Sequence, residues 1–196
     1  MKRIKAFALC FALCFSALQA EVISVIPRPA KMEVGQGVFT FKQNVKVAVP
    51  KFEGDSVKNV FNTFKVDFEK ATGLELETTK KAQKADMVLS VNPELAAEAY
   101  RLQVTADKIN ISAAHPVGFF YAFQTLKQLM PRNVMAARPA ADVKTWTVPV
   151  VDIDDAPRFG WRGFMLDEGR HFYGKEAIKD VIDILATYKM NRFHWH

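Results

Sequence analysis

Cysteine is nearly absent from this sequence of 196 residues, which contains only Cys10 and Cys14. Both lie close to the N-terminus, so neither a disulfide-stapled scaffold nor a zinc site built on cysteine is expected in the remainder. The glycine-rich loops that bind phosphate or dinucleotides are missing, as is the Gly-x-Ser-x-Gly turn of serine hydrolases. No motif calls for a cofactor, and we expect none. The chain is also too short for a complete (β/α)8 barrel, which needs about 250 residues.

Basic charge is concentrated at the N-terminus, within residues 1–5. An apolar run over residues 6–18 follows, and Ala20 offers a small residue at a cleavage point before Glu21. This layout predicts a secretory signal peptide over residues 1–20 and export to the periplasm or the extracellular space. The run is short for a membrane span, although an uncleaved N-terminal anchor is the alternative. Both cysteines lie in this segment, so the predicted mature chain has none.

The overall basic balance is partly a targeting feature. The sequence has 27 Lys and Arg against 21 Asp and Glu, a formal net charge of +6. Removal of Lys2, Arg3 and Lys5, with no acid, lowers that charge to +3. A small excess of this kind, with no aromatic residues between the lysines of residues 80–84, gives no reason to expect a nucleic-acid partner.

Residues 21–150 alternate between strand-like and helix-like patterns, which predicts an α+β domain. Val57, Phe61 and Phe64 recur at helical spacing, and Gly73 follows as a stop signal. Two helices on one face of a mixed sheet would bury this apolar content. The predicted elements are connecting chain over 21–36, strands over 37–41 and 45–49 with a turn at Gln43-Asn44, a helix over 56–71 capped by Asp55 or Ser56, a strand over 87–91, a hairpin of strands 100–105 and 108–112, a helix over 116–130 and a linker over 132–150.

A different pattern begins near residue 151. A strand over 162–167 ends in an acid, a helix with an apolar stripe covers 175–190, and a second strand covers 191–196. This β-α-β order is the unit of a parallel sheet or a barrel. A lone unit of this kind has no closed sheet, so we expect the sequence to break off within a domain.

Arg170 is the strongest candidate for a functional residue, because the loops after barrel strands carry chemistry. Its planar guanidinium has five donors and suits two neighbouring sugar hydroxyls. The alternative is an ion pair with Asp167 or Glu168. Asp167 would then orient Arg170 or cap the loop, and we favour the structural role. We expect His171 to be packed or hydrogen-bonded rather than a general base, since no nucleophile lies near it in the sequence.

His194 and His196 lie two residues apart on the second strand and therefore share one face. Two imidazoles in this arrangement bind a metal when a third ligand is present, and the sequence shows none. We therefore expect no metal site, with both histidines filling the barrel interior or bonding to neighbours. A metal-dependent barrel hydrolase built on these two residues remains the weaker alternative.

Two stretches resemble glycoside hydrolase family 20, the β-N-acetylhexosaminidases. Residues 161–172, Trp-Arg-Gly-Phe-Met-Leu-Asp-Glu-Gly-Arg-His-Phe, resemble the opening of the catalytic barrel, and residues 188–196 resemble its second strand. Looser similarity at residues 26–29, 100–104 and 118–126 extends over the small domain that precedes the barrel. The resemblance implies an α+β N-terminal domain over 21–150, followed over 151–196 by the first β-α-β of a truncated TIM (β/α)8 barrel.

The resemblance also implies a chemistry and a substrate class. Family members are retaining exo-glycosidases in which the substrate's own 2-acetamido oxygen attacks the anomeric carbon, and an Asp-Glu pair assists. That pair is expected beyond His196, so no catalytic residue is assigned within these 196 residues. Arg170 matches the arginine that binds the 3- and 4-hydroxyls of the terminal sugar. Glu168-Gly169 departs from the small or neutral residues more usual there.

The expected partners are glycans that end in N-acetylhexosamine, and the sequence gives no indication of oligomeric state. The expected function is β-N-acetylhexosaminidase activity, carried by a longer chain and absent from these 196 residues alone. The alternative is a non-catalytic secreted module in which residues 21–150 serve glycan binding or scaffolding.

Overall fold

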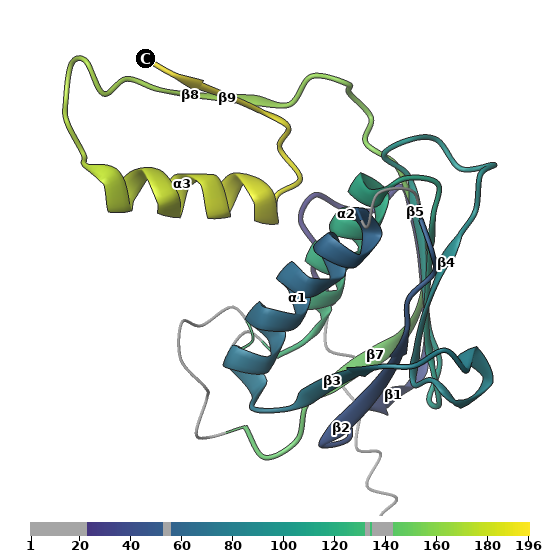
Figure 1. Ribbon diagram of the computed structural model, residues 1–196. Coiled ribbons are helices and arrows are strands. Elements are labelled where there is room, and N and C mark those ends of the chain that lie inside the picture. The colour runs from purple at the N-terminus through teal and green to yellow at the C-terminus, as the bar shows by residue number, and fades with distance from the viewer. Residues whose placement is uncertain (1–22, 53–55, 132–133, 135–142) are drawn as a thin grey trace, which may run out of the picture.

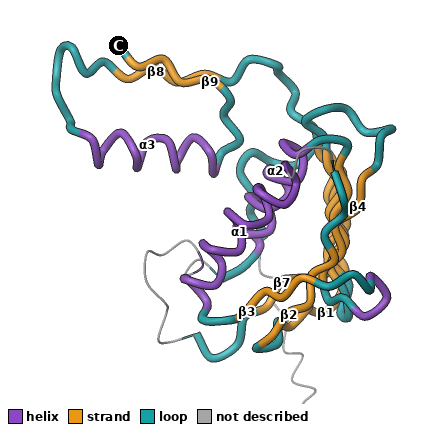
Figure 2. The backbone as a smooth tube through the Cα atoms, viewed as in Figure 1, coloured by secondary structure: helices purple, strands orange, loops and turns teal. Residues whose placement is uncertain are grey.

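The computed structural model describes residues 23–52, 56–131, 134 and 143–196. The predicted signal peptide, Asp55 and residues 135–142 of the predicted linker lie outside these residues. Figure 1 shows a curved sheet with two helices against one face, and a smaller unit that carries the C-terminus. The backbone trace in Figure 2 separates these layers into helix and strand. The predicted mixed sheet with two helices on one face is therefore confirmed.

Seven strands form the sheet in the order β1-β7-β5-β6-β4-β2-β3. The predicted strand over 87–91 is β4, and the predicted hairpin is the antiparallel pair β5–β6. Parallel pairs join β4 to β6 and β2 to both β3 and β4, so the sheet is mixed. The strands are β1 (Lys31–Thr40), β2 (Asn44–Ala48), β3 (Glu75–Thr78), β4 (Met87–Val91), β5 (Tyr100–Val104), β6 (Ile109–Ala113) and β7 (Thr147–Asp155).

The link between β1 and β2 requires the sheet to curl. Only residues 41–43 separate these strands, yet they lie five positions apart in the strand order. Four Cα steps span at most about 15 Å, whereas five strand spacings of a flat sheet span about 24 Å. The predicted turn at Gln43-Asn44 between neighbouring strands is therefore wrong. β1 pairs with β7, and the short link instead joins two distant strands of a curled sheet.

β7 occupies part of the predicted linker and runs through the boundary predicted at residue 150. It lies between β1 and β5 and extends the sheet to Asp155. Pro149 suggested a linker because proline cannot donate a ladder hydrogen bond. The strand tolerates it because β5 pairs with β7 only from Val151 onward, which leaves β1 as the neighbour of Pro149.

Two further strands differ from the sequence prediction. β1 begins at Lys31, inside the stretch predicted as connecting chain, because Met32 and Val34 pair with residues of β7. β3 was not predicted, since Leu76 is the one fully buried side chain among its four residues. A short strand at a sheet edge, with one buried residue, has too little alternation to be detected.

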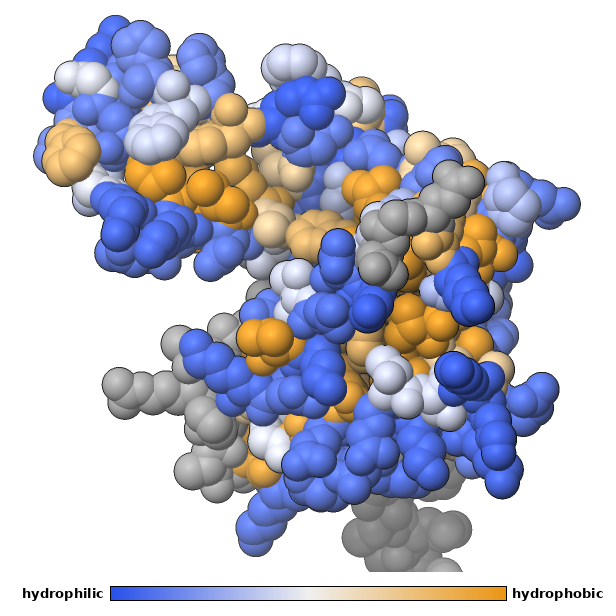
Figure 3. All heavy atoms as spheres, viewed as in Figure 1, coloured by the Kyte–Doolittle hydropathy of each residue, from blue (hydrophilic) through white to orange (hydrophobic). Residues whose placement is uncertain are grey.

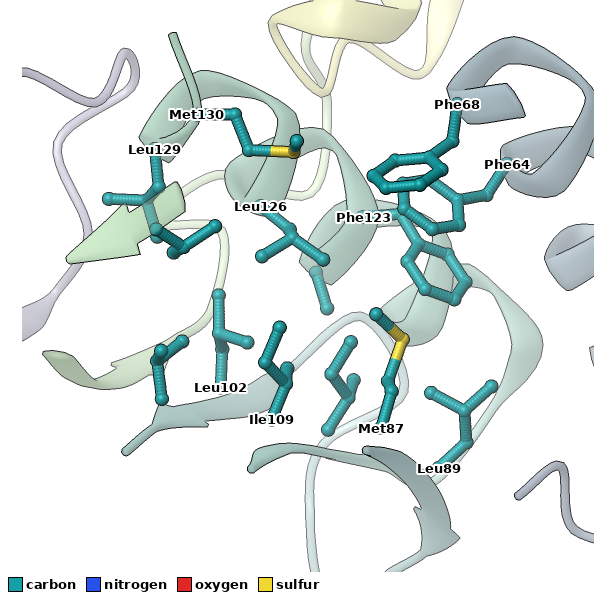
Figure 4. Close-up of a cluster of buried hydrophobic side chains, with 14 of the residues drawn as sticks. Phe64, Phe68, Met87, Leu89, Leu102, Ile109, Phe123, Leu126, Leu129 and Met130 are labelled. Carbon is teal, nitrogen blue, oxygen red and sulfur yellow. The ribbon is translucent and has the colours of Figure 1, made fainter. Parts of the chain in front are cut away.

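The hydrophobic core lies between the sheet and the helices α1 (Ser56–Thr72) and α2 (Pro116–Leu129). Phe64 of α1 stacks on Phe123 of α2 with ring centroids 4.2 Å apart, and Leu102 and Ile109 of the sheet lie beneath Leu126 (Figure 4). Both helices confirm the predicted apolar spacing, and Gly73, at φ +71°, ends α1 as expected.

The C-terminal unit has the predicted β-α-β order. It consists of β8 (Gly163–Leu166), α3 (Lys175–Thr187) and β9 (Arg192–Trp195), and the two strands are parallel. Apolar side chains of α3 are only partly covered, since Ile182 and Ile184 are 48% and 54% exposed. The sheet of this unit has two strands, so both of its edges are outer edges.

A buried ion pair joins the two units. Lys189, just after α3, places its Nζ 2.8 Å from Asp155 Oδ2 at the end of β7, and both side chains are almost inaccessible. The same Nζ donates to the Tyr100 hydroxyl at 2.8 Å, and that hydroxyl also bonds to Asp155 and Thr125. Burial acts to raise the pKa of Asp155. The Lys189 ammonium, the Tyr100 hydroxyl and the Ala30 amide outweigh burial and hold that pKa below its ordinary value.

Lys189 has a left-handed backbone, with φ +59°. This conformation is uncommon for a residue with a side chain and is typical of the position that ends a helix. The helix predicted to continue to Met190 therefore ends at Thr187, and the turn directs Lys189 into the sheet domain. The ion pair and the turn support each other, because the turn is what brings the ammonium to Asp155.

A second polar cluster lies beside the first. Both terminal nitrogens of Arg162 donate hydrogen bonds to the carboxylate of Glu98, at 2.9 and 3.1 Å. Its Nε donates a hydrogen bond to the Lys189 carbonyl at 2.8 Å. The Tyr121 hydroxyl and the Asn191 amide also bond to Glu98. The hydrogen bonds from Arg162 hold the pKa of Glu98 below its usual range. The starts of β8 and β9 are thereby tied to the loop before β5.

Replacing Lys189 by Met should loosen the C-terminal unit. Asp155 would lose its partner, and removal of one member of a buried pair costs about 3 kcal/mol. Amide hydrogen exchange in α3 should then accelerate by roughly a hundredfold in the full chain. Lys179→Met, at an exposed lysine of α3, is the matched control and should leave exchange unchanged. Equal exchange in both variants would contradict a stabilising role for the pair.

A chain of residues 21–157 should fold by itself, whereas residues 21–146 should not. The longer version keeps β7, which buries Val148, Val151 and Ile153. Burial of each such side chain contributes about 1.5–3 kcal/mol, so losing all three removes much of the stability of a small domain. Thermal melting followed by circular dichroism should be cooperative for the longer version alone. Matching melting curves would show that β7 is dispensable.

Candidate functional site

The candidate site is the loop over residues 167–174, which follows β8 and precedes α3. Because β8 and β9 are parallel and Leu166 lies opposite Trp195, the carboxyl ends of both strands meet at this loop. The backbone closes the junction: the His196 amide donates to the Leu166 carbonyl at 3.0 Å, and the Glu168 amide donates to the His196 carbonyl at 2.8 Å. The loop is thus anchored on both strands.

Asp167 forms the centre of the site. Its Oδ1 accepts a hydrogen bond from the Arg170 amide at 2.9 Å, and its Oδ2 lies 3.2 Å from Arg170 Nε. Of the two predicted roles, capping the loop and orienting Arg170, the structure shows contacts for both. The hydrogen bond from the Arg170 amide, followed by contact with His196, holds the pKa of Asp167 below its ordinary value. The carboxylate is therefore charged at neutral pH.

Arg170 is highly accessible, with 91% of its side chain exposed. The predicted ion pair with Asp167 is present, and it engages Nε, the nitrogen nearest the backbone. The two terminal nitrogens of the guanidinium belong to the accessible part of the side chain. An exposed pair of this kind contributes little to stability, so the arrangement orients the arginine more than it stabilises the fold.

Glu168 contributes to the loop through its own backbone and carboxylate. Its Oε1 accepts a hydrogen bond from the Tyr173 amide at 2.9 Å, which spans the loop. His171 is exposed at the surface of the loop, and its ring makes an edge-on contact with the Tyr173 ring, with centroids 4.6 Å apart. Asp167 and Glu168 together close the loop from which Arg170 projects.

The two histidines at the end of β9 differ in their contacts. Their ring centroids lie 6.2 Å apart, and His196 Nδ1 lies 3.4 Å from Asp167 Oδ1. Among the described residues, no group of three His, Cys, Asp or Glu side chains is placed to hold a metal ion. The metal-dependent alternative therefore has no ligand set in this part of the chain.

A cleft of about 580 Å³ lies away from this loop, between α3 and the helices α1 and α2. Phe64, Phe120 and Ile184 contribute apolar lining, and Asp180 and Asp183 line its α3 side. Figure 3 shows apolar atoms at the surface of the C-terminal unit along this side. The cleft does not include Arg170 or Asp167, so it is separate from the candidate site.

None of the described helices is long and apolar enough to cross a membrane.

Family models match nearly all of the described chain. The model for domain 2 of glycosyl hydrolase family 20 matches residues 22–156, and the model for the catalytic domain of that family matches residues 159–196. The chain belongs to glycoside hydrolase family 20. The two matched segments meet just after β7, which is where the sheet ends.

Curated relatives of this chain are named β-hexosaminidases. A β-hexosaminidase from Vibrio furnissii is 35% identical over 92% of this chain, which covers 27% of that protein. One from Porphyromonas gingivalis is 33% identical over 89% of this chain, covering 22% of it. The chain thus spans about a quarter of the length of these family 20 relatives.

Solved family 20 structures share the fold. The exo-β-N-acetylglucosaminidase of Vibrio harveyi, solved in complex with N-acetylglucosamine, matches 88% of this chain at 33% identity with a TM-score of 0.73, over 25% of its own length. The β-N-acetylhexosaminidase of Streptomyces coelicolor matches 88% at 31% identity with a TM-score of 0.78, over 34% of its length.

The residues that hold this family 20 site in place were not identified from the sequence. Lys189 was assigned to a helix and Asp155 was not assigned a role, yet they form the buried junction. The pairing of Arg162 with Glu98 spans 64 residues and has no local sequence signal. A residue other than glycine with a left-handed backbone likewise gives no signal in the helical periodicity of a sequence.

Proposed function

We propose that this chain is the N-terminal part of a β-N-acetylhexosaminidase that removes terminal N-acetylhexosamine from the non-reducing ends of glycans. The proposal rests chiefly on the Arg170 loop, which lies at the carboxyl ends of two parallel strands in a chain of family 20. It is also supported by relatives named β-hexosaminidase and by a similar structure solved with N-acetylglucosamine.

The C-terminal unit is proposed to be the first β-α-β of a (β/α)8 barrel. Its parallel strands, the helix between them and the partly exposed apolar side chains of α3 fit one segment of such a barrel. In barrels of this kind, the active site lies at the carboxyl ends of the strands. The loop over 167–174 is at that end.

Arg170 is proposed to bind the 3- and 4-hydroxyls of the terminal sugar. A planar fork can donate to two neighbouring oxygens, and Asp167 already engages Nε. The accessible terminal nitrogens are the donors required. Binding both hydroxyls of a terminal ring leaves no room for a further sugar there, which accounts for exo action.

The proposed mechanism is substrate-assisted and retaining. The 2-acetamido oxygen of the sugar attacks the anomeric carbon, an acid protonates the leaving oxygen, and water then opens the cyclic intermediate. The Asp-Glu pair that assists these steps is proposed to lie beyond His196. The role of the present residues is to bind and orient the sugar. The signal peptide proposed over residues 1–20 would export the enzyme to the periplasm or beyond.

The 196-residue chain alone should not hydrolyse an aryl N-acetyl-β-glucosaminide, because the proposed acid and base are not among its residues. Its rate should equal that of buffer. The longer protein, of which this chain is proposed to be the N-terminal part, should hydrolyse the same substrate. No activity in that longer protein would favour the non-catalytic glycan-binding or scaffold module, and turnover by the short chain would contradict the placement of the catalytic pair.

Arg170→Lys in the longer enzyme should lower kcat/KM by more than about tenfold, because lysine keeps the charge and loses the two-pronged geometry. Discrimination against a substrate lacking the 4-hydroxyl should also shrink, since the group that penalises its absence is weakened. The melting temperature should stay within about 1–2 °C, because the side chain is exposed. Lys175→Arg, at an exposed residue of the same unit, is the control. Unchanged kinetics with a lower melting temperature would identify Arg170 as a structural ion-pair residue.

A further inference from the structure

The loop over 167–174 is organised by two adjacent carboxylates, which we call the carboxylate bracket. Asp167 Oδ1 accepts the Arg170 amide and Glu168 Oε1 accepts the Tyr173 amide, each at 2.9 Å. The two bonds overlap along the chain and hold successive parts of the loop. Both carboxylates belong to the residues that directly follow β8, so the loop is held from the strand that precedes it.

Asp167 has a further contact that Glu168 lacks. Its second oxygen lies 3.2 Å from Arg170 Nε, so one carboxylate binds both the backbone and the side chain of the same residue. The ion pair to Nε restrains the start of a side chain that is otherwise exposed. An arginine without this restraint has several rotatable bonds and loses their entropy when it binds a ligand.

Asp167 is itself held in place. His196 Nδ1 lies 3.4 Å from Oδ1, and the backbone of His196 is bonded to Leu166 and Glu168. Gly169 brings the chain close to this group, since a Cβ there would lie 3.4 Å from Asp167 Oδ1 and 3.5 Å from His196 Nδ1. The carboxylate is thus fixed by β9 as well as by β8.

We propose that Asp167 is a positioning residue that acts through Arg170: it presents the terminal nitrogens of the guanidinium to two vicinal hydroxyls of the sugar, while Glu168 holds the loop that carries them. This inference rests on the proposed function for the identity of the ligand. The preorganisation of the loop does not depend on that identity. In this role Asp167 acts on the sugar through Arg170 and not on the reacting atoms, so its removal should weaken sugar binding and specificity.

Hydrogen exchange on the 196-residue chain tests the bracket without catalysis. Asp167→Ala should accelerate exchange of the Arg170 amide by about tenfold and leave the Tyr173 amide nearly unchanged, and Glu168→Ala should do the reverse. The His196 amide, which bonds to Leu166, reports whether the strands remain paired. Glu176→Ala is the matched control, because this exposed acid pairs with Lys179 outside the loop.

Steady-state kinetics on the longer enzyme tests the action through Arg170. Asp167→Asn keeps the size and loses the charge, and it should raise KM for an aryl N-acetyl-β-glucosaminide by about fivefold with a smaller change in kcat. The same substitution in the Arg170→Lys background should have little further effect, because the two residues act as one unit. Discrimination against the 4-deoxy substrate should fall in the single variant as well.

Two results would overturn the proposal. One is an Arg170 amide that exchanges equally fast in the wild-type chain and in Asp167→Ala. The other is an effect of Asp167→Asn that persists in full when Arg170 is already Lys, since Asp167 would then act by another route. If the longer wild-type protein has no glycosidase activity, the proposed function fails by itself, because the exchange result does not require turnover.

Discussion

The buried pair of Lys189 and Asp155 is the interaction on which the relation between the two units depends. It joins the end of the last strand of the sheet to the turn after α3, and Tyr100 and Thr125 complete its hydrogen bonds. Two buried charges are costly to desolvate, and they are tolerated where each has a full set of partners. The pair therefore fixes one arrangement of the units more than it adds stability. The ion pair between Arg162 and Glu98 lies beside it and also joins the two units.

The position of the candidate site depends on this junction. Arg162 and Asn191 stand at the starts of β8 and β9, and the loop that carries Arg170 lies at the opposite ends of the same strands. Each strand has four residues, so a tilt at the junction moves the loop directly. The sheet domain thus positions the loop over residues 167–174 through the paired strands β8 and β9.

Local patterns predicted the elements with strong periodicity. α1, α2 and the hairpin follow from buried residues at regular spacing. The β-α-β order follows from the apolar stripe of the helix between two strand-like segments, and the loop with Arg170 follows from its place after a strand. The patterns failed where pairing is distant or the signal is short. Pro149 favoured a linker where β7 lies, and the four residues of β3 are too few to show a strand pattern. The short link between β1 and β2 depends on how the whole sheet curls. Lys189 could not be predicted, because its turn is stabilised by a carboxylate 34 residues away.

The position of β7 also governs the order in which the chain can fold. β1 is an edge strand whose only neighbour in the sheet is β7, and their paired residues lie more than a hundred positions apart. During synthesis the first strand therefore emerges long before its partner, and its backbone groups stay unpaired until β7 is made. Contacts of such long range slow folding and expose a strand edge to wrong partners. The register of the β1–β7 pairing shifts between Val34 and Val38, and this irregularity in β1 makes the strand a poorer template for wrong partners.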